Sequence, residues 1–97
     1  MKSFAELFKK YKLHAEFETY SAFANELSQK GFVYEESIFS HWQKGTRVPA
    51  NRNLILAVIE IFIARKAIKK RAEANELLAT TGLGYLTKQE LQKVFKL

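Results

Sequence analysis

Apolar residues recur along the chain at the three- to four-residue spacing of helices that bury one face. Two pairs, Ser3 with Glu6 and Thr87 with Glu90, match the capping box that starts a helix, and glycines stand where several segments should end. The pattern predicts five to six helices, over these ranges: Phe4 to about His14, Thr19 to before Gly31, about 36–44, Ala50 to Ala64, about Lys70 to Thr81, and a last one after Thr87.

The segment from Leu54 to Ala64 is apolar almost all round, which predicts a central, buried helix. Its isoleucine and valine content would also suit a strand, but no partner strand or turn signal lies nearby. At ~1.5 Å per residue it is too short to cross a bilayer core of about 30 Å, so no membrane span is expected. We therefore expect one all-α domain over residues 1–97, with a core over about 3–65 and C-terminal helices over about 69–97.

The segment 36–49 has two chemically different faces when it is drawn as a helix. The apolar face contains Ile38, Phe39 and Trp42. The polar face is a narrow arc that contains Ser37, Ser40, His41 and Lys44. Hydroxyl, imidazole and ammonium groups can reach base edges or phosphates in a DNA major groove. Gly45 then supplies a helix stop, after which Thr46 and Arg47 turn back toward a DNA backbone. The segment is typical of a DNA recognition helix.

The net charge of +6 is concentrated in the middle third of the chain. Residues 37–71 carry eight Lys or Arg and one acid, Glu60, for a net +7, whereas residues 1–36 sum to −1 and residues 72–97 to zero. Cations beside a polar helix face favour a polyanionic partner, because each neutralised phosphate releases counterions. A solvated helix face is nevertheless the favoured interpretation of the densest part of this charge, Arg65, Lys66, Lys69, Lys70 and Arg71.

Two blocks of residues, TYSAFA at 19–24 and FSHWQKGTRVP at 39–49, carry a family resemblance. They resemble the helix-turn-helix core of the phage lambda-repressor-like family, the xenobiotic-response-element type of transcriptional regulator. The resemblance implies a lambda-repressor-like helical bundle in which Ala24 closes the packing of two helices. It also implies that Phe39 and Trp42 flank exposed positions of the recognition helix.

The chain departs from that family's pattern in two places. Residues 28–35 exceed the length of the family's turn, which implies a second helix that is longer by about a turn. Gln43 stands where the family commonly has glutamate, and we expect it to support the fold against the first helix rather than to read bases.

The resemblance and the polar arc together imply sequence-specific binding of double-stranded DNA by a bacterial or phage transcriptional regulator. The residues expected to face base edges in the major groove are Glu36, Ser37, Ser40 and His41. The residues expected to hold phosphates are Lys44, Thr46, Arg47, Asn51 and Arg52. A homodimer is a working hypothesis, because such folds commonly pair two recognition helices. Its expected surface is formed by apolar side chains that could equally cap the core: Leu77, Leu78, Leu91, Val94 and Phe95.

The rival interpretation is a protein-interaction or assembly module that keeps the same fold. An enzyme is not expected, because the chain has no Cys and no Asp, and nothing in the sequence orients the imidazole of His41 beside Ser37. No metal site is expected, since His14 is the only other histidine. No cofactor or small-molecule substrate is evident. The polar N-terminal residues lack the apolar run of a signal peptide, which favours the cytoplasm.

Overall fold

The computed structural model describes residues 2–96 and is all-helical over that range, with six helices and no strand. The helices are α1 (Phe4–His14), α2 (Tyr20–Gln29), α3 (Glu36–Lys44), α4 (Arg52–Ala64), α5 (Arg71–Ala79) and α6 (Lys88–Phe95). The predicted all-α class is therefore confirmed, and the helix ends agree with the sequence pattern within two residues. The lambda-repressor-like arrangement stays a prediction.

The connection between α2 and α3 begins where the sequence predicted it. Helix α2 ends at Gln29, two residues before the glycine that was expected to stop it. Gly31 then adopts a φ of 93°, a left-handed conformation that glycine reaches without strain and that turns the chain away from the helix axis. Residues 32–35 are not helical. Ser28 and Gln29 thus belong to α2, and residues 30–35 form the loop before α3.

Helix starts are fixed by side chains that accept hydrogen bonds from otherwise free backbone N–H groups. Ser3 Oγ accepts from Glu6 N at 3.2 Å, and the Glu6 carboxylate accepts from Ser3 N at 3.1 Å. Thr87 and Glu90 form the second capping box. The backbone hydrogen bond from Ser3 is the main reason that the pKa of Glu6 is lowered. Both capping boxes that the sequence predicted are present.

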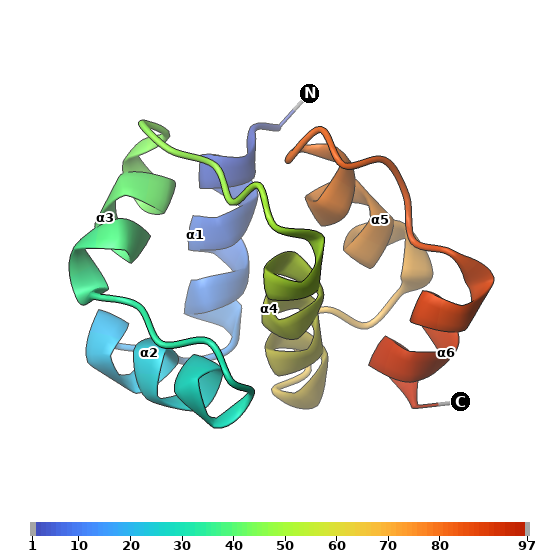
Figure 1. The fold of residues 1–97 in the computed structure, drawn as a ribbon, viewed down its shortest axis with the longest axis horizontal. Helices are drawn as coiled ribbons and strands as arrows, with labels where there is room; N and C mark the ends of the chain where they lie inside the picture. The colour runs from blue at the N-terminus through green and yellow to red at the C-terminus, as the bar shows by residue number, and fades with distance from the viewer. Residues whose placement is uncertain (1, 97) are drawn as a thin grey trace.

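Helix α4 runs through the centre of the molecule, with α1, α2 and α3 on one side and α5 and α6 on the other (Figure 1). Every residue from Leu54 to Ile59 is buried, as are Ile61 and Phe62. This confirms the central position that the apolar run predicted. No helix within residues 2–96 combines the length and the apolar character that crossing a bilayer requires.

An aromatic cluster fills the space between α1, α2, α3 and α4. The ring of Trp42 on α3 lies edge-on to that of Phe8 on α1, with centroids 5.6 Å apart, and to that of Phe39, at 5.1 Å. Phe23 on α2 lies 5.1 Å from Phe39, and Phe62 on α4 completes the contact at 5.8 Å from Phe23. Edge-to-face pairs of this kind add to the stability given by apolar burial. The cluster fixes α3 to the core through one face.

Two polar atoms are buried near this cluster without a hydrogen-bond partner among the described residues: the hydroxyl of Tyr11 and Oε1 of Gln43. Burial, followed by the charges of Glu73 and Glu76 on α5, raises the pKa of Tyr11 to about 12. The hydroxyl therefore stays neutral. Gln43 is half-buried, so its side chain belongs partly to the interior of the fold rather than wholly to the exposed face.

The C-terminal helices add to the core rather than presenting an apolar surface. Leu77 and Leu78 on α5 are completely buried, and Val94 on α6 is 1% exposed. Leu91 and Phe95 are partly buried and pack against the same hydrophobic core. These are the side chains on which the dimer hypothesis depended. Their burial favours the alternative interpretation, in which they cap the core.

Replacing Trp42 with Ala removes the largest buried side chain and should lower the free energy of unfolding by about 3 to 5 kcal/mol. Urea denaturation measures this loss. The control is Val33→Ala, because Val33 is 81% exposed and its truncation should change stability by less than about 0.5 kcal/mol. Equal effects of the two substitutions would contradict the burial of the apolar face of α3.

Candidate nucleic-acid interface

Helix α3 divides into a buried and an exposed face, as its sequence pattern predicted. Phe39 and Trp42 are buried, and Ile38 is half-buried. On the opposite face the exposed residues are Glu36, Ser37, His41 and Lys44, and Ser40 is half-buried. Because the aromatic cluster fixes the buried face, the polar face is held rigidly toward solvent. Rigid placement of polar groups is what base recognition requires.

The turn after α3 is built around Gly45, whose φ of 83° is left-handed. In this conformation the backbone N–H groups of Thr46 and Arg47 both donate to the carbonyl of His41, at 3.1 and 3.4 Å. An added Cβ on Gly45 would lie 3.6 Å from the Cβ of Ala5 on α1, which is an ordinary contact. The requirement for glycine therefore comes from the backbone angle rather than from lack of space.

The turn also places Thr46 against α3. Its Oγ1 lies 2.8 Å from Nδ1 of His41, and both residues are exposed. The sequence offered no group to orient this imidazole, because the contact depends on the reversal at Gly45 rather than on helical spacing. Thr46, which the sequence predicts to hold a phosphate, therefore also contacts His41.

Lys44 and Arg47 are the two cations nearest to the polar face of α3 in the sequence. Both are exposed, and within residues 2–96 neither side chain forms a hydrogen bond or an ion pair with another protein group. Their charges are therefore available to an anionic partner. The structure leaves both of these expected phosphate contacts possible.

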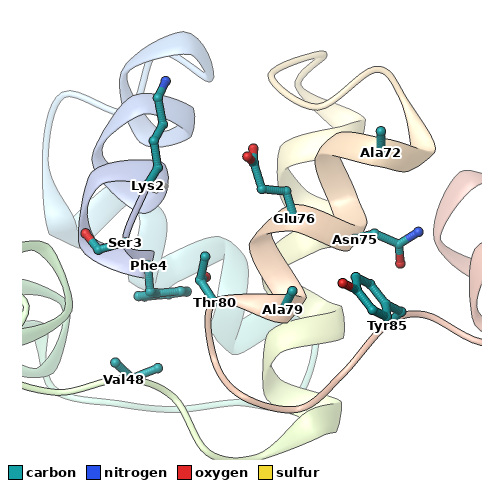
Figure 2. A pocket seen from close by; sticks show the side chains of 10 residues that line it. All are labelled: Lys2, Ser3, Phe4, Val48, Ala72, Asn75, Glu76, Ala79, Thr80 and Tyr85. Atoms are coloured by element: carbon teal, nitrogen blue, oxygen red, sulfur yellow. The ribbon is translucent and has the colours of Figure 1, made fainter.

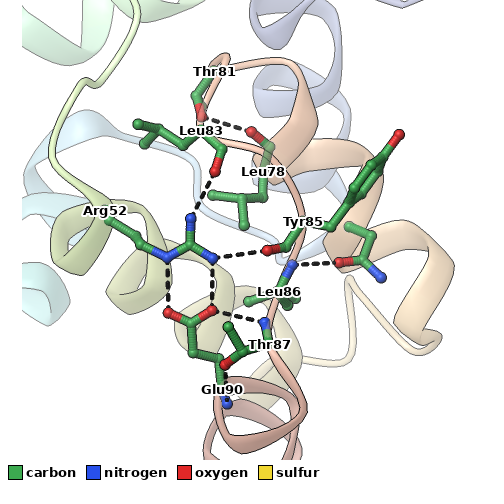
Figure 3. Close-up of polar contacts among 9 residues, drawn as sticks. Arg52, Leu78, Thr81, Leu83, Tyr85, Leu86, Thr87 and Glu90 are labelled. Carbon is green, nitrogen blue, oxygen red and sulfur yellow. Dashed lines mark hydrogen bonds and ion pairs between the residues drawn. The ribbon is translucent and has the colours of Figure 1, made fainter.

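Arg52 is used inside the protein instead (Figure 3). Its Nε and Nη2 donate to the two carboxylate oxygens of Glu90 at 2.8 and 2.7 Å, which is a bidentate ion pair. Nη1 donates to the carbonyl of Leu83 at 2.6 Å, and Nη2 also donates to that of Tyr85 at 2.8 Å. A guanidinium with these partners joins the start of α4 to α6 and its preceding loop. Arg52 therefore does not belong to the candidate interface.

The neighbouring Asn51 is exposed, but its Oδ1 accepts from the backbone N–H of Leu54 at 3.2 Å. This hydrogen bond makes Asn51 the N-cap of α4. Of the two residues expected to hold phosphates at the start of α4, one therefore caps the helix and the other binds Glu90.

The positive charge of residues 37–71 is divided between the two ends of α4. Lys44 and Arg47 precede this 13-residue helix, whereas Lys66, Lys69, Lys70 and Arg71 follow it, about 20 Å away at the rise of an α-helix. Arg65 pairs with Glu26 on α2 and stacks on the ring of Phe17, with 4.0 Å to the ring centroid. The net +7 is thus not a single surface, and only two of its cations flank the polar face of α3.

A cavity of about 610 Å³ lies beside the start of α1, bordered by α5 and the loop before α6 (Figure 2). Its wall includes exposed apolar side chains, with Val48 44% and Tyr85 70% exposed. The lining residues are Lys2, Ser3, Phe4, Val48, Ala72, Asn75, Glu76, Ala79, Thr80 and Tyr85. No sequence pattern predicts this cavity, the α1–α5 groove, because segments that are far apart in the chain form it.

No group of three or more His, Cys, Asp or Glu side chains within residues 2–96 is arranged to hold a metal ion. The chain matches no family model, no curated protein and no solved structure.

The Arg52–Glu90 pair should make the free energy of unfolding depend on pH. Hydrogen bonds from Arg52 are the main cause that lowers the pKa of Glu90 from 4.5 to about 2. Since the folded-state pKa lies below the unfolded one, this contribution is fully present above about pH 4.5 and is lost as the pH falls toward about 2.

Replacing Glu90 with Gln should therefore lower the melting temperature by several degrees at pH 7, and the difference from the wild type should shrink as the pH falls from 5 to 2. Thermal unfolding followed by circular dichroism across this range measures it. Glu76→Gln is the control, because Glu76 is exposed and forms no ion pair within the described residues. A difference that stays constant with pH would contradict the role of the carboxylate.

Proposed function

We propose that the chain binds double-stranded DNA in a sequence-specific manner through the exposed face of α3 and the turn that follows it, as a regulator of transcription. The observation that carries the proposal is the contrast between the two faces of this helix. One face is anchored by Phe39 and Trp42 in the aromatic cluster, and the other presents hydroxyl and imidazole groups beside two cations that have no protein partner within residues 2–96. The resemblance of residues 19–24 and 39–49 to a helix-turn-helix core supports it.

Each exposed group has a role in this proposal. Ser37, Ser40 and His41 face base edges, where short polar side chains can donate and accept hydrogen bonds. Glu36, in the first turn of α3, accepts from the amino group of cytosine and favours specificity at a cost in affinity, because a carboxylate repels phosphates. Lys44 and Arg47 hold the phosphates that set the register of the helix in the groove.

A second candidate function is a protein-interaction or assembly module, and the groove between α1 and α5 is the observation that favours it. Apolar lining and exposed Val48 and Tyr85 suit a partner side chain better than a phosphate.

Either function is compatible with a homodimer, but the buried leucines of α5 would not form its surface. Sedimentation at micromolar concentration, with and without DNA, tests for it.

Binding to duplex DNA should weaken as salt is added, but only moderately. Lys44 and Arg47 can neutralise about 2 phosphates, so the logarithm of affinity should fall with that of salt at a slope of about −2. Fluorescence anisotropy of a labelled random-sequence duplex measures the slope. Absence of binding at low salt would refute DNA binding and favour the interaction module.

Substitutions should separate anchoring from base reading. Lys44→Ala or Arg47→Ala should weaken binding to all duplexes alike, whereas Ser37→Ala should change the base preference at one position by about 1 to 3 kcal/mol. Selection of bound duplexes from a random pool, with each variant, measures both effects. Lys88→Ala is the matched control, because Lys88 is an exposed lysine at the start of α6. Uniform losses from all three substitutions near α3 would contradict the proposed orientation of the helix.

A further inference from the structure

We infer that Thr46 is a positioning residue that holds the imidazole of His41 in one tautomer, with Nε2–H as an outward hydrogen-bond donor that reads an acceptor on a base edge. The base-reading half of this inference rests on the proposed DNA binding, whereas the tautomer is a property of the protein alone. An exposed threonine or histidine alone does not indicate base reading. The contact between Thr46 and His41 is the observation that does.

The single hydroxyl hydrogen of Thr46 has two acceptors within reach. Nδ1 of His41 lies 2.8 Å from Oγ1, and the carbonyl oxygen of His41 lies 3.3 Å from it, so the contact with Nδ1 is the shorter of the two hydrogen bonds. That carbonyl already accepts from the backbone N–H of Thr46 at 3.1 Å. With the hydroxyl hydrogen assigned to the shorter contact, Oγ1 donates to Nδ1, and Nδ1 is the ring nitrogen without hydrogen. In the neutral imidazole the hydrogen is then on Nε2.

The orientation of the ring follows from the same contact. Gly45 fixes the path of the chain, and the threonine side chain, which is branched at Cβ, has few rotamers available. Nδ1 faces Thr46, so Nε2 lies at the other end of the ring, on the exposed face that also carries Ser37 and Lys44. A side chain held in one rotamer loses less entropy when it binds.

A donor at this position selects bases by their major-groove edges. Guanine offers two acceptors, N7 and O6, while adenine offers N7 and thymine offers O4. Cytosine presents only its amino group there, which is a donor. His41 should therefore face a guanine by preference and reject a cytosine. The opposite tautomer, with a bare Nε2, would favour cytosine and the amino group of adenine.

The tautomer can be measured in the free protein by ¹⁵N nuclear magnetic resonance at about pH 8.5, where imidazole groups are neutral. We expect Nδ1 of His41 at the downfield position of a nitrogen without hydrogen and Nε2 at the upfield position of a nitrogen that carries one. His14 is an internal reference, because it is exposed and its ring has no hydrogen bond among the described residues. Thr46→Val should shift the His41 signals toward those of His14, and Thr46→Ser should preserve them. A hydrogen on Nδ1, or signals unchanged in Thr46→Val, would overturn the inference.

Base reading is tested by selecting duplexes from a random pool with the wild type, His41→Ala, Thr46→Val and Thr46→Ser. The wild type should prefer guanine at the position that loses its preference in His41→Ala. In Thr46→Val that preference should fall by about five- to tenfold, and Thr46→Ser should restore it. Replacing that guanine with 7-deazaguanine, which lacks the N7 acceptor, should weaken binding of the wild type but not of His41→Ala.

The outcomes separate this inference from the proposed function. If DNA binds specifically but the position read by His41 is a cytosine, the donor assignment is wrong while DNA binding stands. If no duplex binds, the proposed function and the base-reading half of the inference both fail, and the resonance data alone decide whether Thr46 holds the ring. If Thr46→Val lowers affinity for all duplexes equally, Thr46 is a phosphate ligand and not a positioning residue.

Discussion

The packing of Trp42 and Phe39 against rings of α1 and α2 is the interaction on which the other features of the candidate interface depend. A nine-residue helix is too short to be stable in isolation, so α3 exists because tertiary contacts hold it. Phe8 contacts Trp42 and Phe23 contacts Phe39, and all four rings are buried. The apolar face of α3 is therefore fixed by packing, whereas residues on its polar face can be replaced without loss of these contacts.

A second constraint is set by Arg52, which connects the two halves of the fold. Its guanidinium joins the first residue of α4 to α6 and to the carbonyls of Leu83 and Tyr85. The side-chain pair is only partly exposed, with 33% of Arg52 and 20% of Glu90 accessible, so solvent weakens it less than a surface pair. The start of α4 also ends the turn that carries Arg47. Through the Arg52–Glu90 pair, α6 thus holds the start of α4 and with it the end of the segment that connects α3 to α4.

The sequence predicted the helices because the signals for them are local. Apolar spacing, the capping boxes and Gly45 each act within a few residues of one another, and they located all six helices and both faces of α3. The partner of Arg52 lies 38 residues away, and no local pattern identifies it. The His41–Thr46 contact spans only five residues, but it requires a left-handed turn that helical spacing does not describe.

The separation of the two faces of α3 has a consequence for how this protein could diversify. Ser37, His41 and Lys44 are exposed and contribute nothing to the aromatic cluster, so most substitutions at these positions should leave the fold intact. Thr46 lies outside the helix, and through it one mutation could reorient an existing side chain instead of replacing it. New binding preferences could then arise by single steps through folded intermediates, without compensating changes in the core.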